Sequence, residues 1–205
     1  MFNPTHSPHP EHPATGPDDL YAGRPPWDIG RPQPAFVSLA ETGDIGGRVL
    51  DIGCGTGEHA LMAAGLGLEA VGVDQSATAL ASAERKAADR GSAARFVRHD
   101  ACTLPELGEV FDTVLDCGLF HIFTGAGRAG YVRSLHAVIR PGGRYFMLGF
   151  SEAEQGVWGP HRLSRDEIAV AFTDGWQVDS IEPAVIDIIP DPGGVAAWLV
   201  ELTRK

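Results

Sequence analysis

Short apolar runs alternate along the first 150 residues with longer segments in which apolar positions recur at helical spacing. Each run predicts a buried strand, and each longer segment predicts a helix, several of them opened by a proline or serine and closed by glycine. The expected strands are residues 48–52, 69–73, 95–98, 111–115 and 144–148. The expected helices are residues 34–41, 58–66, 77–90 and 130–139. This alternation indicates a parallel sheet covered on both faces.

The pattern changes after Phe150. Ser164 and Glu167 have the spacing of a capping box that opens a helix to about residue 172. Residues 176–181 and 196–202 then alternate like strands of a closing antiparallel pair. We therefore expect a Rossmann-like α/β fold, with a seven-stranded, mostly parallel sheet, an antiparallel closing strand and helices on both faces. Ligands of such sheets bind at the carboxyl ends of the strands.

The chain length fits one domain. A chain of 205 residues holds one full α/β domain and is short for two. Residues 1–20 are rich in proline and histidine and predict a flexible tail. Residues 21–205 contain no repeat and no interdomain linker, so we expect them to form a single domain.

Composition and charge narrow the class of partner. The formal net charge of −11 disfavours nucleic acid and anionic membranes, which attract clustered Lys and Arg. The three cysteines of the chain are scattered and form no Cys-x-x-Cys pair, which disfavours a disulfide framework or a zinc site. The start of the chain shows no secretory signal pattern. We expect a cytoplasmic protein with a small-molecule partner, and the sequence leaves its oligomeric state open.

The most informative stretch is residues 51–57, Asp-Ile-Gly-Cys-Gly-Thr-Gly, where an expected strand runs into alternating glycines before a helix. Glycines let a ligand approach exposed backbone N–H groups. Dinucleotide-binding turns place their third glycine one residue later than Gly57. A nicotinamide oxidoreductase is further disfavoured because the chain shows no catalytic Tyr-x-x-x-Lys or His/Asp pair.

This turn, preceded by Asp51, resembles the first motif of class I S-adenosylmethionine-dependent methyltransferases. The resemblance implies that Asp51 helps to orient the methionine amino group. It also implies that Asp74, at the tip of the second strand, accepts the ribose hydroxyls, and that Asp100 and Ala101 contact adenine. Residues 141–143, Pro-Gly-Gly before the fifth strand, are the last of these family-like features along the chain.

The segment of residues 25–34 is too proline-rich for a helix interior and predicts a rigid lid carrying Trp27 and Arg31. Trp27 as a filler between the first helix and the sheet is the alternative. Its Pro-Trp-Asp-x-Gly-Arg core resembles the N-terminal motif of plant halide and thiol methyltransferases and thiopurine methyltransferases, whose tryptophan touches the cofactor. The expected cofactor-contacting residues are Trp27, Arg31, Asp51, Gly53, Cys54, Gly55, Gly57, Asp74, Gln75, Asp100, Ala101 and Cys117.

Three further stretches, residues 118–121, 134–138 and 172–176, resemble heterocyclic-toxin methyltransferases known from mycobacteria. This likeness covers roughly residues 25–181. It implies O-methylation of a hydroxylated heteroaromatic or phenolic small molecule. S-methylation of a thiol or another soft nucleophile remains open, as does a non-catalytic regulator that only binds S-adenosylmethionine.

Enzymes that methylate amide-like nitrogens have an Asn/Asp-Pro-Pro-aromatic turn after the fourth strand. This chain has Asp-Cys-Gly-Leu there, beginning at Asp116, and so does not resemble those enzymes. Residues 149–152 lack the Asp-Asn pair of metal-dependent catechol-type enzymes, so no metal is expected.

His121 follows the fourth strand and is the candidate general base for a hydroxyl acceptor. The alternative is that His121 caps the next helix or bonds to backbone, and a thiolate acceptor would need no base. The expected acceptor-binding residues are Tyr21, Phe120, Trp158 and His161.

Overall fold

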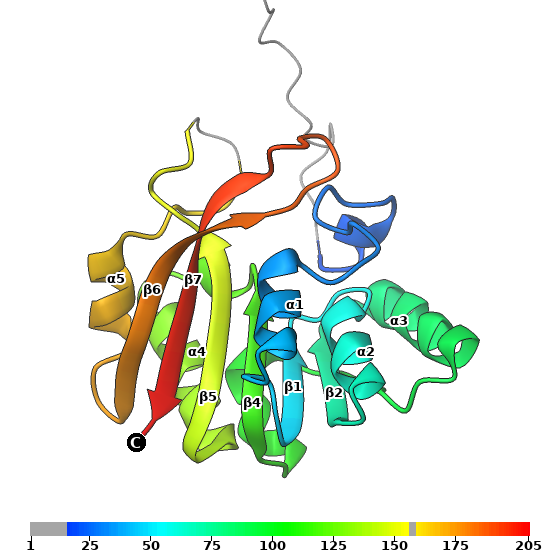
Figure 1. The fold of residues 1–205 in the computed structure, drawn as a ribbon, viewed down its shortest axis with the longest axis horizontal. Helices are drawn as coiled ribbons and strands as arrows, with labels where there is room; N and C mark the ends of the chain where they lie inside the picture. Colours follow the sequence, from blue (N-terminus) through cyan, green and yellow to red (C-terminus); the bar gives the residue numbers. More distant parts are fainter. Residues whose placement is uncertain (1–15, 156–158) are drawn as a thin grey trace, which may run out of the picture.

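Seven strands form one mixed sheet in the order β3-β2-β1-β4-β5-β7-β6, in a computed structural model that describes residues 16–155 and 159–205 (Figure 1). β1 to β5 run parallel, and β7 runs antiparallel to both β5 and β6. The expected Rossmann-like sheet with an antiparallel closing strand is confirmed. The strands are β1 (Arg48–Ile52), β2 (Glu69–Asp74), β3 (Arg95–Arg98), β4 (Phe111–Cys117), β5 (Ile139–Phe150), β6 (Trp176–Ile186) and β7 (Val195–Arg204).

Helices cover both faces of this sheet, as Figure 1 shows for α1 and α2 in front and α4 behind. Buried residues of α1 and α2 form one core with one face, and those of η2, α4 and α5 form a larger core with the other. The helices are η1 (Asp19–Tyr21), α1 (Pro34–Glu41), α2 (Glu58–Gly65), α3 (Ala77–Arg90), η2 (Ala101–Leu107), η3 (Phe120–Ile122), α4 (Gly125–Val138) and α5 (Arg165–Ala171).

Local signals explain the best-matched helices. The Ser76 hydroxyl accepts a hydrogen bond from the Ala79 amide and opens α3, and Gly91 closes α3 in the left-handed conformation. Ser164 and Glu167 form the expected capping box of α5. These caps satisfy backbone groups that a helix end leaves unpaired, so the helix bounds follow from nearby sequence.

The parallel register brings the strand ends to one level. Ile52 of β1 lies opposite Val73 of β2 and opposite Asp116 of β4. The turns that follow these strands therefore meet at one edge of the sheet, between β2, β1 and β4.

Several bounds differ from the expectation. β4 continues through Asp116 to Cys117, and α4 begins five residues earlier, at Gly125. β6 runs through Pro183, which an edge strand tolerates because proline's missing N–H can face away from the sheet.

The expected flexible tail, residues 1–20, overlaps a helix at its end. Residues 1–15 lie outside the described residues, but residues 19–21 already form η1. The side chain of Asp18 accepts hydrogen bonds from the Ser76 hydroxyl and the Thr78 amide at the start of α3. These contacts join residues 58 and 60 positions apart, so no local sequence signal predicts them.

Candidate active site

The glycine turn (residues 53–57) connects β1 to α2 beside the end of β2. The Cys54 amide donates to the Val73 carbonyl at 2.9 Å, and the Gly55 amide donates to Oδ2 of Asp74 at 2.9 Å. Gly55 and Gly57 have φ of 51° and 84°, a left-handed region that side chains other than glycine rarely adopt. The turn thus presents bare backbone at the edge where β1 and β2 end.

Two carboxylates flank the glycine turn. Asp51 is buried on β1, and its Oδ2 accepts from the Ala60 amide of α2 at 3.0 Å. Asp74 ends β2 and accepts from the Ser76 amide at 2.8 Å as well as from Gly55. Burial raises the pKa of Asp74, and the charge of Asp51 adds to that rise, against hydrogen bonds from Ser76 and Gly55. The structure therefore gathers two acids at the turn, as the sequence predicts.

The other expected cofactor residues on this side lie at the ends of β2 and β3. Gln75 is exposed directly after β2, and its carbonyl accepts from the Arg98 side chain. Asp100 is exposed and caps η2 by accepting from the Cys102 amide, while Ala101 is buried. Because β2 and β3 are paired neighbours, these residues and Asp74 share one sheet edge.

A strap (residues 16–33) lies across the glycine turn. A Cβ built on Gly55 would come within 2.6 Å of the Tyr21 hydroxyl, so the Tyr21 ring lies against the turn backbone. Trp27 packs edge-on against Tyr21 with ring centroids 6.5 Å apart and remains 46% exposed. Thr56 donates its hydroxyl to Oδ1 of Asp28 at 3.0 Å. The alternative in which Trp27 only fills a gap under the first helix does not fit this exposure.

The far end of the strap is tied to the β6–β7 loop (residues 187–194). Arg31 forms a 2.6 Å ion pair with Asp187, and the Gln33 side chain exchanges two hydrogen bonds with the Asp187 backbone. The Ile189 amide donates to the Pro26 carbonyl. The guanidinium of Arg31, an expected cofactor contact, is thus held by Asp187, 156 residues away.

His121 lies in the turn after β4 (residues 118–121, here the β4 turn), and backbone holds one of its ring nitrogens. Nδ1 accepts from the Phe150 amide at 3.1 Å, and Nε2 lies beside Gly118. A neutral ring whose Nδ1 accepts a hydrogen bond carries its proton on Nε2. Burial lowers the pKa of His121 to about 4, although the Gly118 backbone favours the charged ring. The geometry matches the alternative in which His121 bonds backbone.

The expected acceptor-binding residues are not brought together. Phe120 is fully buried between α4 and α5, against Tyr131 and Phe172, so its side chain lies in the core in this structure. His161 is turned to Glu167, with Nε2 2.7 Å from its Oε1. Trp158 lies outside the described residues. Tyr21 lies on the glycine turn, nearer the expected cofactor residues.

Sequence reasoning missed a buried cluster around Asp116. The carboxylate accepts from the hydroxyls of Tyr131 and Tyr145 and from the amides of Leu119 and Phe120. Cys117, which follows, is half-buried, and burial raises the pKa of its thiol. The available signal was Tyr131, which shares the apolar helical face of Leu135 and Val138 and so had to find a polar partner inside.

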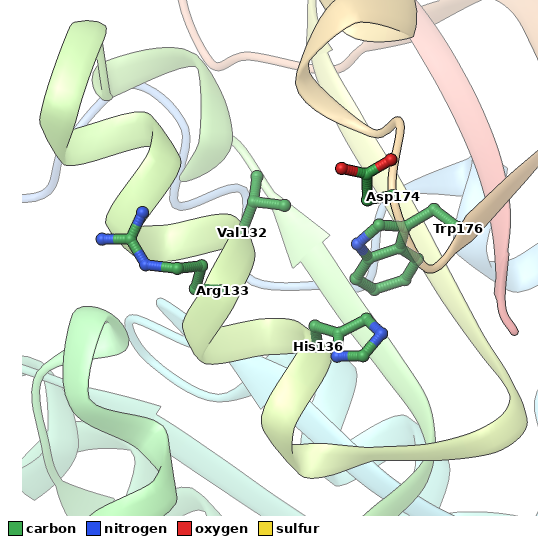
Figure 2. Close-up of a pocket in the computed structure, with 5 residues that line it drawn as sticks. All are labelled: Val132, Arg133, His136, Asp174 and Trp176. Carbon is green, nitrogen blue, oxygen red and sulfur yellow. The ribbon is translucent and has the colours of Figure 1, made fainter.

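A separate hollow lies at the other edge of the sheet (Figure 2). The hollow is lined by Val132, Arg133 and His136 of α4 and by Asp174 and Trp176 near the start of β6. This edge holds the amino ends of the parallel strands, so the hollow is not part of the candidate site.

Within the described ranges, no group of three or more His, Cys, Asp or Glu side chains is placed to hold a metal ion. No helix there is long and apolar enough to cross a membrane.

Comparisons with known proteins place this architecture. A family model for a methyltransferase domain matches residues 49–143. The chain is 39% identical over 166 residues to 2-heptyl-1-hydroxyquinolin-4(1H)-one methyltransferase of Mycobacteroides abscessus, covering 80% of this chain and 73% of that protein. It is 33% identical over 176 residues to probable thiol methyltransferase 2 of Arabidopsis thaliana, covering 84% and 77%.

A solved structure described as "Conversion of a Disulfide Bond into a Thioacetal Group during Echinomycin Biosynthesis" has a TM-score of 0.83 and 39% identity to this chain. The match covers 92% of this chain and 91% of that one. The fold, the ordered glycine turn with its acids and the extent of these likenesses agree. The chain belongs to the S-adenosylmethionine-dependent methyltransferases, and S-adenosylmethionine is its cofactor.

Proposed function

We propose that this enzyme O-methylates a small, flat heteroaromatic or phenolic compound whose hydroxyl is acidic enough to ionise without help from the protein. The observation that carries this proposal is the state of His121, whose Nδ1 lone pair is used to accept the Phe150 amide and whose ring is buried. A general base needs a free lone pair near the acceptor proton. The relative in M. abscessus is named for a 1-hydroxyquinolin-4-one, a compound with an N-hydroxyl group.

The residues at the strand ends fit the cofactor. The Gly55 backbone is bare enough to admit a close neighbour, as the contact with Tyr21 demonstrates. Asp74 offers a half-buried carboxylate, a group suited to ribose hydroxyls, and Asp51 adds a second acid beside it. We propose that these residues, with Gly53, Gly57 and Asp100, hold S-adenosylmethionine. The bound cofactor supplies a methyl group on a sulfonium, which loses its charge on transfer.

In this proposal the protein contributes position and exclusion of water. A sulfonium that reacts with an anion loses charge separation, so a dry, preorganised site favours transfer. The strap is tied to α3 by Asp18, to the glycine turn by Asp28 and to the β6–β7 loop by Arg31, which places it beside the site. We also propose a cytoplasmic location, because all three cysteines are free and thiols stay reduced in the cytosol.

The direct test is transfer of isotope-labelled methyl from S-adenosylmethionine to a panel of acceptors, read by mass spectrometry of the products. The panel contains 2-heptyl-1-hydroxyquinolin-4(1H)-one, hydroxyquinolines of graded acidity and simple phenols. We expect O-methyl products, with rates that rise as the acceptor hydroxyl becomes more acidic. Rates that are equal for acidic and weakly acidic hydroxyls at one pH would contradict the proposal of self-ionising acceptors.

A sulfur acceptor is the second candidate. It is favoured by the 33% identity to a probable thiol methyltransferase and by the 39% identity to the structure described by conversion of a disulfide into a thioacetal. A thiolate, like an acidic hydroxyl, needs no base. Aryl thiols and a cyclic disulfide in the same panel separate the two candidates, because S-methyl products without O-methyl products would replace the first by the second.

His121 gives a prediction that separates structure from catalysis. In His121→Asn, the amide oxygen can take the place of Nδ1 and accept from the Phe150 amide, whereas His121→Ala removes this acceptor. We expect His121→Asn to keep turnover within about threefold, since general-base loss costs about a hundredfold or more. We expect His121→Ala to lower the free energy of unfolding by about 2–4 kcal/mol, from the lost hydrogen bond and the cavity.

The measurements are steady-state turnover on a weakly acidic phenol and urea denaturation of both variants. A drop of about a hundredfold in His121→Asn, with unfolding unchanged, would restore His121 as the base.

A further inference from the structure

The carboxylate of Asp116 collects four hydrogen-bond donors from three elements of the fold. Oδ2 accepts from the Tyr131 hydroxyl of α4 at 2.6 Å and from the Tyr145 hydroxyl of β5 at 2.7 Å. Oδ1 accepts from the Leu119 amide at 2.8 Å, and Oδ2 accepts from the Phe120 amide at 3.0 Å. The two tyrosines and Asp116 are all fully buried.

Such a cluster is costly in a core that is otherwise apolar. Taking a carboxylate out of water is unfavourable unless its lone pairs are satisfied, and here burial raises the pKa of Asp116 to about 6 even with these donors present. Leu50 and Val114, buried nearby in the same core, illustrate the apolar alternative. A polar cluster whose members are all bonded specifies one arrangement of the chain around it, which an apolar core does less strictly.

The arrangement that Asp116 specifies is the β4 turn. Two of its four donors are amides of that turn, those of Leu119 and Phe120. The same turn is tied to β5 by two more bonds, from the Gly118 amide to the Leu148 carbonyl and from the Phe150 amide to His121. The backbone of the β4 turn is thereby held by Asp116 on one side and by β5 on the other.

The β4 turn lies directly beside the glycine turn. Asp116 is level with Ile52 in the β1–β4 ladder, and Gly53 follows Ile52. A Cβ built on Gly53 would be 3.1 Å from the Leu119 side chain, so Leu119 lies close against the glycine turn. The position of Leu119 therefore depends on the bond from its own amide to Asp116.

We propose that Asp116, with Tyr131 and Tyr145, acts as a positioning residue that holds the β4 turn against the glycine turn and so fixes the acceptor side of the site relative to the cofactor. The proposal rests on the methyl transfer activity of the family and on neither choice of acceptor atom. Asp116 itself does not touch the reacting atoms, because its lone pairs are turned to the four donors.

The test uses Tyr131→Phe and Tyr145→Phe, which remove one hydroxyl each and keep the rings. Phe146→Leu is the matched control, because Phe146 is equally buried on β5 but belongs to the core on the opposite face of the sheet. For each protein we would measure the melting temperature, the affinity for S-adenosylhomocysteine by calorimetry, and kcat and KM for the best acceptor of the panel.

We expect each tyrosine variant to lower kcat/KM for the acceptor about tenfold, since small displacements of positioned groups reduce rate strongly. We expect S-adenosylhomocysteine affinity to stay within about threefold, because Asp51 and Asp74 are untouched. Phe146→Leu, at a similar loss of melting temperature, should leave kcat/KM within about twofold. The proposal is overturned if the tyrosine variants keep kcat/KM, or if Phe146→Leu loses as much.

Amide hydrogen exchange, followed by NMR, tests the geometry without any acceptor. The Leu119 and Phe120 amides should be protected in the wild-type enzyme and exchange at least about tenfold faster in either tyrosine variant, while amides of β1 stay protected. Unchanged exchange at Leu119 and Phe120 would overturn the proposal even if no compound of the panel were methylated.

Discussion

Replacing Asp74 with alanine is expected to weaken binding of S-adenosylmethionine and S-adenosylhomocysteine by about a hundredfold or more, because hydrogen bonds to a charged group contribute about 1.5–3 kcal/mol each. The carboxylate stands at the tip of β2, half-buried, and its bond from the Gly55 amide also shapes the glycine turn. The variant therefore loses a ligand group and a support of the turn. Isothermal calorimetry with S-adenosylhomocysteine measures the effect without needing an acceptor.

Two variants make this result interpretable. Asp74→Asn keeps an oxygen for the Gly55 amide and removes one acceptor, so we expect an intermediate loss of affinity. Asp100→Ala removes an exposed carboxylate that bonds the Cys102 amide at 2.8 Å, and we expect a smaller loss than in Asp74→Ala. Affinity of Asp74→Ala within about threefold of wild type would show that the ribose hydroxyls are held elsewhere.

The parts of the candidate site that the sequence predicts are those whose residues lie close together along the chain. The glycine turn, Asp51 and Asp74 follow from one strand, one turn and the next strand end, and the caps of α3 and α5 lie within four residues of the helices they open. Their geometry is set by backbone rules that act over a few residues. The parallel register then brings them to one edge.

The parts that the sequence does not predict depend on contacts between distant segments. Arg31 meets Asp187 across 156 residues, and Asp116 meets Tyr145 across 29. No local pattern states which of several exposed acids an arginine will meet. The β4 turn illustrates the same limit, because the order Leu119-Phe120 does not show that Leu119 faces Gly53 while Phe120 enters the core.

His121 shows why a residue type at a strand end is weak support for catalysis. Imidazole at the mouth of the site fits a base by position. In the structure, its ring instead ties the turn after β4 to the end of β5, because Nδ1 accepts from the Phe150 amide. A group whose lone pair is used for structure must give up that bond before it takes a proton.

Replacing Gly57 with alanine is expected to lower the free energy of unfolding by about 2–5 kcal/mol, the sum of about 1–2 kcal/mol for left-handed backbone and about 1–3 kcal/mol for overpacking. Gly57 has φ of 84°. A Cβ there would lie 2.6 Å from the Phe96 ring of β3 and 2.8 Å from Cβ of Ala83 on α3. The third glycine of the turn is thus needed where α2 begins against β3 and α3. Urea denaturation measures the loss.

Gly67→Ala separates the two causes. Gly67 has nearly the same φ, 81°, but nothing lies within 4 Å of a Cβ built there. Gly67→Ala should lower the free energy of unfolding only by the cost of the left-handed backbone, about 1–2 kcal/mol. If Gly57→Ala loses no more than Gly67→Ala, then Phe96 moves aside and the early third glycine is required for backbone conformation alone. If it loses more, the excess measures how closely α3 and β3 are packed on the glycine turn.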